Sequence, residues 1–342
     1  MNKVKVKNAN YLLLIVVFFI TILPQIIIPL LELMLNFDFN ELSKSNETFK
    51  TVLLLIDQYV FILIPVIIFI IANKLSFKEV FRLNPINLSA GVLTVLMAIA
   101  AWVVSIFTTL IVYHIYTIII GKPYNTVSDI IPLNIYVGFF LVAITPAICE
   151  EALFRGIVLK AYENRGTVKA IVITALFFAI IHISIVRVAG PFIIAILAGY
   201  LVAKSNSIIP AVLTHMTFNG TSLCIYYITR TMPQQPERLP TMTEYFVLSI
   251  FVAFALLVIA VCIIGFNFVT TPRYNSSSKG LLFKTFLGSS EQEYRPFKKP
   301  ITSISRDFVS IISSWPVILI ILIFIFYNII DIYSILQNRI IQ

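Results

Sequence analysis

Long apolar runs are the feature that most constrains the fold of this 342-residue chain. An α-helix needs about 20 apolar residues to cross the roughly 30 Å hydrocarbon core of a bilayer. The chain contains nine such runs, at about residues 11–35, 51–72, 90–120, 134–155, 167–185, 191–203, 208–227, 243–269 and 315–333. The sixth run is short, so its helix is tilted, also includes residues 186–190, or does not cross the membrane completely. The alternative count is therefore eight spans. The pattern predicts an all-α, polytopic membrane bundle of about nine transmembrane helices.

Composition excludes a water-soluble globule. Apolar residues make up 59% of the chain and charged residues 12%, whereas soluble domains average about 45–50% and about 25%. The net charge of +9 fits loops that face an anionic leaflet. No nucleic-acid-binding motif accompanies this charge, so we expect membrane lipids and no nucleic acid among the partners.

The distribution of Lys and Arg predicts how the chain lies in the membrane. Placing the N-terminus in the cytoplasm puts most basic residues in cytoplasmic connections, with the largest block in residues 270–314. The Ile-, Asn- and Lys-rich, cysteine-poor composition leans towards a bacterial cytoplasmic membrane. We expect a polytopic core over residues 1–269, a basic cytoplasmic segment over 270–314 and a C-terminal transmembrane helix over 315–342. With nine spans the C-terminus lies outside the cell, and with eight spans it lies in the cytoplasm.

A first cluster of polar residues interrupts the fourth apolar run. A charged side chain near the bilayer centre costs about 2.5–3.5 kcal/mol on insertion scales, so each one needs a reason. Glu151 and Arg155 have the favourable i, i+4 order for an ion pair. Glu150 projects about 100° away with no evident cation, which makes it the candidate general base. A kink at Pro146 would make room for water or a substrate backbone. The alternative is a purely structural Glu–Arg staple at the membrane boundary.

Two further clusters contain histidines inside apolar runs. A lone His in an apolar helix is usually satisfied by a backbone carbonyl or a hydroxyl, and His114 is assigned to that class. His182 follows Phe178 at i, i+4. His215 and Asn219 have the same spacing, which puts an imidazole and a carboxamide on one helix face.

The position of Gly166 relates the first two clusters to each other. Gly166 is the expected turn of an antiparallel hairpin between the fourth and fifth helices. Glu150 and His182 lie equally far from this turn along the chain, so we expect them at equal depth, about 24 Å from the tip. The sequence therefore predicts that Glu150, His182, His215 and Asn219 share one cavity, reached from the cytoplasm.

This set of groups favours hydrolysis by activated water. Glu150 would take the proton, His182 would orient the water, and Asn219 would donate to the developing oxyanion. Glu150, His182 and His215 also match a catalytic zinc site with one open position. Metal-bound and metal-free water both remain open. The chain has no G-x-S-x-G, no HExxH and no G-x-G-D arrangement.

Taken in order, the three clusters resemble a known family of intramembrane peptidases. This is the CAAX prenyl protease 2 and bacteriocin-processing family, also called CPBP or Abi, whose pattern is EExxxR, then FxxxH, then HxxxN. The matching positions are Glu150-Glu151…Arg155, Phe178…His182 and His215…Asn219. They fall within residues 142–223, inside a motif region of about 134–227, in an expected eight-helix core. The segment from 270 to 342 is not covered by the pattern.

The resemblance implies an endopeptidase that cuts peptide bonds at the cytoplasmic membrane boundary. It implies that Glu150 and His182 activate water, that His215 and Asn219 hold the oxyanion, and that Glu151 with Arg155 maintains the site. The family is described both as metalloprotease, with zinc, and as glutamate protease, and both readings are kept. The implied substrates are membrane-associated peptides or lipidated proteins, such as CAAX-like C-termini or peptide leaders. The sequence does not predict an oligomeric state.

Two rival interpretations come from other classes of protein. One is a non-catalytic bacteriocin-immunity or scaffold protein of the same family. The other is a proton-coupled transporter, for which intramembrane Glu, Arg and His are typical. Against a transporter, the polar groups form one compact set, and Asp57 and Asp331 are expected near span edges or without partners. Replacing Glu150 by Gln would separate a catalyst from a binding protein, because it keeps the shape and removes the base.

Overall fold

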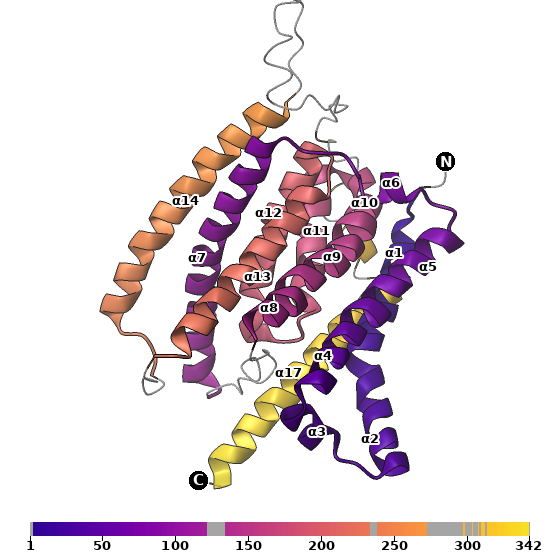
Figure 1. Ribbon diagram of the computed structural model, residues 1–342, viewed down its shortest axis with the longest axis vertical. Helices are drawn as coiled ribbons and strands as arrows, with labels where there is room; N and C mark the ends of the chain where they lie inside the picture. The colour runs from indigo at the N-terminus through magenta and orange to yellow at the C-terminus, as the bar shows by residue number, and fades with distance from the viewer. Residues whose placement is uncertain are drawn as a thin grey trace, which may run out of the picture.

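The computed structural model describes most of the chain as helix (Figure 1). The described residues are 3–121, 134–232, 238–271 and 313–341, together with residues 297, 303, 307 and 309–311. No strand occurs among these residues. The prediction of an all-α polytopic bundle is therefore confirmed.

The first part of the chain forms the helices up to α7. These elements are α1 (Val6–Val17), η1 (Phe18–Ile22), α2 (Leu23–Leu35), α3 (Phe39–Ser45), α4 (Glu47–Leu55), η2 (Ile56–Leu63), α5 (Ile64–Ala72), α6 (Phe77–Val80) and α7 (Leu88–Ile119). The second part carries the three polar clusters. Its elements are α8 (Ile135–Gly138), η4 (Phe139–Ile144), α9 (Thr145–Glu151), η5 (Ala152–Val158), α10 (Leu159–Tyr162), η6 (Glu163–Arg165), α11 (Thr167–Ile180), η7 (Ile185–Arg187), α12 (Ala189–Ser205), α13 (Ile209–Thr229), α14 (Met242–Thr270) and α17 (Trp315–Ile341).

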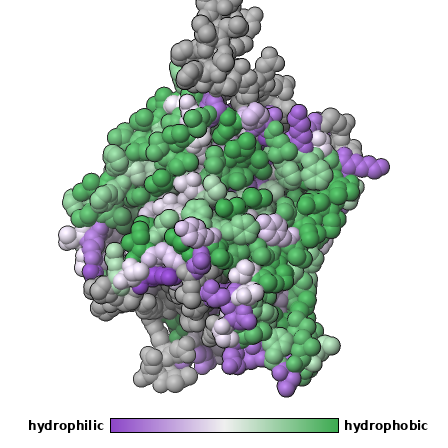
Figure 2. Space-filling model, viewed as in Figure 1, coloured by the Kyte–Doolittle hydropathy of each residue, from purple (hydrophilic) through white to green (hydrophobic). Residues whose placement is uncertain are grey.

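Each of the nine predicted apolar runs corresponds to a helix or to consecutive helices. Six described stretches are long and apolar enough to cross a membrane: Val6–Leu35, Glu47–Ala72, Leu88–Ile119, Ile135–Arg165, Met242–Thr270 and Trp315–Gln337. The other three runs form α11, α12 and α13, of which α11 and α12 are shorter apolar helices. Apolar side chains cover most of the visible face, as expected for a surface in contact with lipid (Figure 2).

Three of the membrane helices widen just before a proline. The π-helical segments η1, η2 and η4 are each followed by an α-helix with proline in its first turn, at Pro24, Pro65 and Pro146. Proline has no N–H to donate and its ring clashes with the carbonyl four residues earlier, so a wider turn relieves both problems. At Pro146, where the sequence predicts a kink, the structure has a π-helical turn directly before the proline-containing helix.

The hairpin predicted around Gly166 is confirmed. Gly166 joins η6 to α11 with φ 117°, a left-handed backbone conformation that side chains with a Cβ rarely adopt. Phe154 and Phe178, at equal distances along the chain from Gly166, pack edge to face with ring centroids 4.9 Å apart. The register that places Glu150 level with His182 is thus correct.

The helix that carries the glutamates lies in the middle of the bundle. In Ile135–Arg165, 61% of the most apolar window is buried inside the protein, compared with 11% in Met242–Thr270. α14 packs mainly against α7 at one edge of the bundle (Figure 1). The helical stretch Ile135–Arg165 is therefore surrounded by protein, whereas α14 faces mostly outward.

The C-terminal helix, α17, packs along α1. Trp315 Nε1 donates to the Tyr11 hydroxyl at 3.0 Å, and the Tyr327 hydroxyl donates to the Thr21 carbonyl at 2.9 Å. Val317 of α17 belongs to an apolar cluster that also contains buried side chains of α1, α5 and α11. Most of the basic segment predicted over 270–314 lies outside the described residues. The domain boundaries and the orientation in the membrane stay predictions.

Candidate active site

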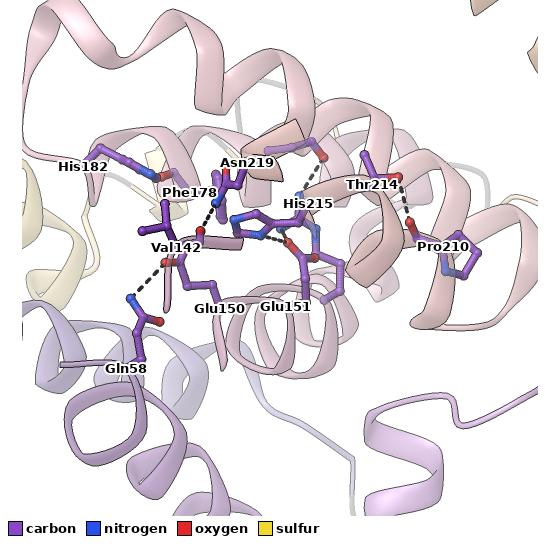
Figure 3. A network of polar contacts seen from close by, with 12 residues as sticks. Gln58, Val142, Glu150, Glu151, Phe178, His182, Pro210, Thr214, His215 and Asn219 are labelled. Carbon is purple, nitrogen blue, oxygen red and sulfur yellow. Dashed lines mark hydrogen bonds and ion pairs between the residues drawn. The ribbon is translucent and has the colours of Figure 1, made fainter. Parts of the chain in front are cut away.

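Four helical elements bring the predicted site residues together. Glu150 and Glu151 end α9, and Arg155 lies one turn later in η5. His182 follows the end of α11, and α13 carries His215 and Asn219. Figure 3 shows these elements converging, with Glu151, His215 and Asn219 joined to their neighbours by hydrogen bonds.

Glu151 is the centre of a buried polar set. One of its oxygens, Oε1, accepts hydrogen bonds from Arg155 Nη1 at 2.8 Å and from His215 Nδ1 at 2.9 Å. Glu151 and Arg155 are each 1% exposed, and His215 is also buried. The ion pair predicted from the i, i+4 spacing is therefore present. Since a carboxylate oxygen accepts, the His215 proton sits on Nδ1, and Nε2 is the unprotonated nitrogen of the neutral ring.

Arg155 connects this set to two more helices. Its Nη2 donates to the Ala195 carbonyl of α12 at 3.1 Å. Its guanidinium carbon lies 4.9 Å from the centroid of the Phe178 ring of α11, in cation–π contact. A buried charge is tolerated only when it is paired and hydrogen-bonded, and Arg155 meets both conditions. We call Glu151, Arg155 and His215 the buried set.

Glu150 has a different environment although it is the adjacent residue. Its side chain is partly exposed, and Oε1 accepts from Gln58 Nε2 at a long 3.4 Å. No salt bridge involves Glu150 among the described residues. Its carboxylate is thus accessible, whereas the Glu151 carboxylate is buried, with Oε1 bonded to Arg155 and His215 and Oε2 without a hydrogen-bond partner among the described residues.

His182 also keeps one ring nitrogen available. Nδ1 lies 2.8 Å from the Phe178 carbonyl, which can only accept, so the proton is on Nδ1 and Nε2 carries the lone pair of the neutral ring. The ring is partly exposed, and it lies close enough to Glu150 for the two side chains to interact electrostatically. The Phe178 ring contacts both histidines, with centroids 5.2 Å from His182 and 5.6 Å from His215.

Asn219 compensates for the proline in the glutamate helix. Pro146 has no N–H for the carbonyl of Val142, four residues earlier, and Asn219 Nδ2 donates to that carbonyl at 2.9 Å (Figure 3). One hydrogen of Nδ2 is used in this bond, while the second hydrogen and Oδ1 have no hydrogen-bond partner among the described residues. We call Glu150, His182 and Asn219 the accessible set, because all three are partly exposed.

The sequence analysis missed two residues of η2. Gln58 contacts Glu150, and Asp57 lies close enough to Glu150 for the two carboxylates to repel each other. Asp57 and Asp331 were expected near span edges or without partners: Asp331 does have a partner, because it accepts a hydrogen bond from the Tyr116 hydroxyl at 2.8 Å, and Asp57 lies inside the stretch Glu47–Ala72. The sequence signal that could have identified Asp57 and Gln58 is that these two adjacent polar residues lie inside an apolar run.

The predicted zinc ligands do not form a ligand cluster. Among the described residues, no group of three or more His, Cys, Asp or Glu side chains is arranged to hold a metal ion. Both His182 and His215 direct Nδ1 to protein acceptors, and both contact the Phe178 ring. Glu150, His182 and His215 thus do not fit a shared ion in this conformation. Zinc stays a prediction, and no step below depends on it.

The fold and the site together define a class, that of multi-pass helical membrane proteins with a polar centre built on the middle helix. Residues 132–221 match the family model described as Rce1-like, type II CAAX prenyl endopeptidase. The segment holds all three motifs, and the resemblance to the CAAX protease family is confirmed. At the level of the family, this match supports a protease that acts on peptide bonds in a membrane setting. No curated protein and no solved structure matched the chain.

Proposed function

We propose that this protein is an intramembrane endopeptidase in which Glu150 and His182 activate the attacking water. The observation that carries the proposal is the contrast between two adjacent glutamates. Glu151 is held by Arg155 and His215, whereas Glu150 is partly exposed and has a single long hydrogen bond. A general base must have acceptor atoms free to meet its substrate, and Glu150 satisfies that condition.

The proposed reaction uses the accessible set for proton transfer. A water molecule donates one hydrogen bond to Glu150 and the other to His182 Nε2, which orients its oxygen towards the peptide carbonyl. Glu150 takes the proton as the oxygen attacks, and a tetrahedral intermediate with a negative oxygen forms. Glu150 then gives its proton to the leaving amine, and the carbon–nitrogen bond breaks.

The oxyanion would be stabilised from α13. The second Nδ2 hydrogen of Asn219 is a donor that the Val142 carbonyl does not use. His215 donates from Nε2 only as an imidazolium, because its Nδ1–H is bonded to Glu151. The bond from Arg155 keeps Glu151 in place, and through Glu151 it also fixes the orientation of the His215 ring.

The substrates we propose are membrane-associated peptides with an apolar or lipidated part. The family description names a prenylated CAAX terminus, which is a short peptide carrying a lipid. Such a chain end lies at the membrane surface, where an apolar bundle meets it without extracting it from lipid. Peptide leaders are the second class to test.

The test compares the wild-type chain with Glu150→Gln in nanodiscs. The probes are an internally quenched farnesylated peptide with a CAAX end and a quenched leader-type peptide, with products identified by mass spectrometry. Glu32→Gln on α2 is the matched control, because Gln still offers an oxygen to the Phe39 amide. We expect cleavage by the wild type and by Glu32→Gln only.

A second experiment does not depend on the choice of peptide. Membrane peptides are compared between cells that express the wild type and cells that express Glu150→Gln. Fragments that appear only with the wild type would identify substrates. Identical peptide sets, or full activity of Glu150→Gln, would contradict the proposal and favour an immunity, scaffold or transport role.

A further inference from the structure

The chain that follows His182 forms a strained loop before α12. Residues 181–188 connect α11 to α12 and contain the short 3₁₀ turn η7. Ile183 adopts φ 56°, in the left-handed region that β-branched residues rarely occupy. Such a conformation costs about 1–3 kcal/mol and persists only when the surroundings hold it. The contacts of this loop therefore hold the backbone that directly follows His182 and the last turn of α11.

The C-terminal helix supplies a hydrogen bond to the loop backbone. Asn328 Oδ1 of α17 accepts from the Ile185 amide at 2.8 Å. The amide group of Asn328 is itself oriented, because its Nδ2 donates to the Phe324 carbonyl one turn earlier at 2.7 Å. An oxygen fixed in this way holds the Ile185 N–H, two residues beyond Ile183.

Side chains of α7 and α17 enclose the same loop. Val186 is buried in a small apolar cluster with Tyr116 of α7 and Ile335 of α17. Asp331 of α17 accepts from the Tyr116 hydroxyl at 2.8 Å and attracts Arg187 of the loop. The loop thus has polar and apolar contacts with the last helix of the chain.

We propose that α17, which lies outside the family-matched segment 132–221, positions His182 for catalysis by clamping the loop at residues 183–187. Asn328 is the principal positioning residue. This inference rests on the proposed function, since it assigns α17 a task in that reaction. A shift of the loop would move His182 Nε2 away from the water that Glu150 activates, and a displacement of about 1 Å can cost up to about 100-fold in rate.

The kinetic test compares Asn328→Ala with Tyr327→Phe in full-length protein, using the farnesylated CAAX probe. Each variant removes one tertiary hydrogen bond of α17, to the loop in the first case and to the Thr21 carbonyl of α1 in the second. We expect Asn328→Ala to lower kcat by about tenfold or more with KM changed by less than about twofold. Tyr327→Phe should leave kcat unchanged, and Asn328→Asp, which retains an acceptor oxygen, should recover most of the rate.

Equal losses in Asn328→Ala and Tyr327→Phe would overturn the inference, since they would show only that α17 must dock. Unchanged kcat in Asn328→Ala would overturn it as well. Hydrogen exchange of the Ile185 amide gives an answer that does not depend on proteolysis. Faster exchange in Asn328→Ala than in Tyr327→Phe supports the clamp, and equal exchange overturns it. If the wild type cleaves no peptide, the proposed function fails while the exchange measurement still decides the clamp.

Discussion

The buried set and the accessible set occupy the same few helical turns, yet they differ in how their polar atoms are used. In the buried set, Arg155 and His215 are both bonded to one oxygen of Glu151. In the accessible set, Glu150 has one long hydrogen bond and His182 keeps Nε2 available. A buried charge must be paired to be tolerated, whereas a catalytic group must remain partly unpaired. The difference teaches that exposure, and not residue type, distinguishes the supporting role that we assign to Glu151 from the catalytic role that we propose for Glu150.

The largest effect expected is that of Glu150→Gln on peptide cleavage. The substitution keeps the hydrogen bond to Gln58 possible and removes the proton acceptor, so we expect kcat to fall about 10²–10⁴-fold. The midpoint of thermal unfolding in detergent should stay within error of the wild type. A variant that loses stability in parallel with activity would place Glu150 in the buried set and break the comparison.

The next effect concerns the stability of the buried set. Arg155→Met leaves the Glu151 carboxylate buried without its cation, which we expect to cost about 3–5 kcal/mol of unfolding free energy. Unfolding in mixed micelles with increasing SDS measures that loss. The double variant Glu151→Gln with Arg155→Met should lose less than the two single variants added together. A strictly additive result would contradict the coupling described above.

A smaller effect is expected at Asn219, which belongs to the accessible set and also supports the backbone. Asn219→Leu leaves the Val142 carbonyl without its donor, at a cost of about 1–3 kcal/mol. Adding Pro146→Ala supplies a backbone N–H to that region and should restore part of the stability. We expect activity to stay low in the double variant, because the oxyanion donor is still missing. Recovery of activity would make Asn219 purely structural.

A still smaller effect is expected for Gln58. Its 3.4 Å hydrogen bond to Glu150 is long, so Gln58→Leu should lower kcat only about three- to tenfold, equivalent to roughly 0.5–1.5 kcal/mol. Gln25→Leu, on an exposed position of α2, is the matched control. A loss as large as that of Glu150→Gln would move Gln58 from a supporting to an essential role.

The mechanism proposed above uses no metal, so under it metal removal has no expected effect. Since Glu150, His182 and His215 do not form a ligand cluster, treatment with 1,10-phenanthroline should leave the cleavage rate unchanged. Elemental analysis should find less than one zinc per chain. A rate that falls with the chelator and returns with added zinc alone would revive the zinc hypothesis and show that the site rearranges around an ion.

Local pattern was enough to predict much of the fold and part of the site. The apolar runs predicted the membrane helices, and the i, i+4 spacing predicted the ion pair between Glu151 and Arg155. The turn at Gly166 predicted the register, because two helices joined by a short turn have little freedom to slide past each other. Motif order was enough to indicate the family, which the match to residues 132–221 supports independently.

Contacts between distant segments were not predictable in the same way. Gln58 lies 92 positions from Glu150, and Asn328 lies 143 positions from Ile185. No spacing rule connects such pairs, since helix packing decides which faces meet. The spacing of His215 and Asn219 placed both on one face of α13, yet it could not show that His215 bonds Glu151 while Asn219 bonds the Val142 carbonyl.

The π-helical turn at Phe139–Ile144 has a consequence for how this helix tolerates insertions and deletions. A π turn takes up about one residue more than an α turn, and each residue of a helix accounts for roughly 100° of rotation. Removing one residue there would shorten the apolar span by only about 1.5 Å, which a bilayer absorbs easily. Because the widened turn already contains the extra residue, the same deletion would convert it into an ordinary α turn and leave the two halves of the helix in nearly the same rotation, whereas a deletion in a regular turn would rotate one half by about 100° relative to the other. This stretch should therefore tolerate the loss of one residue better than the regular turns of α9 that follow it.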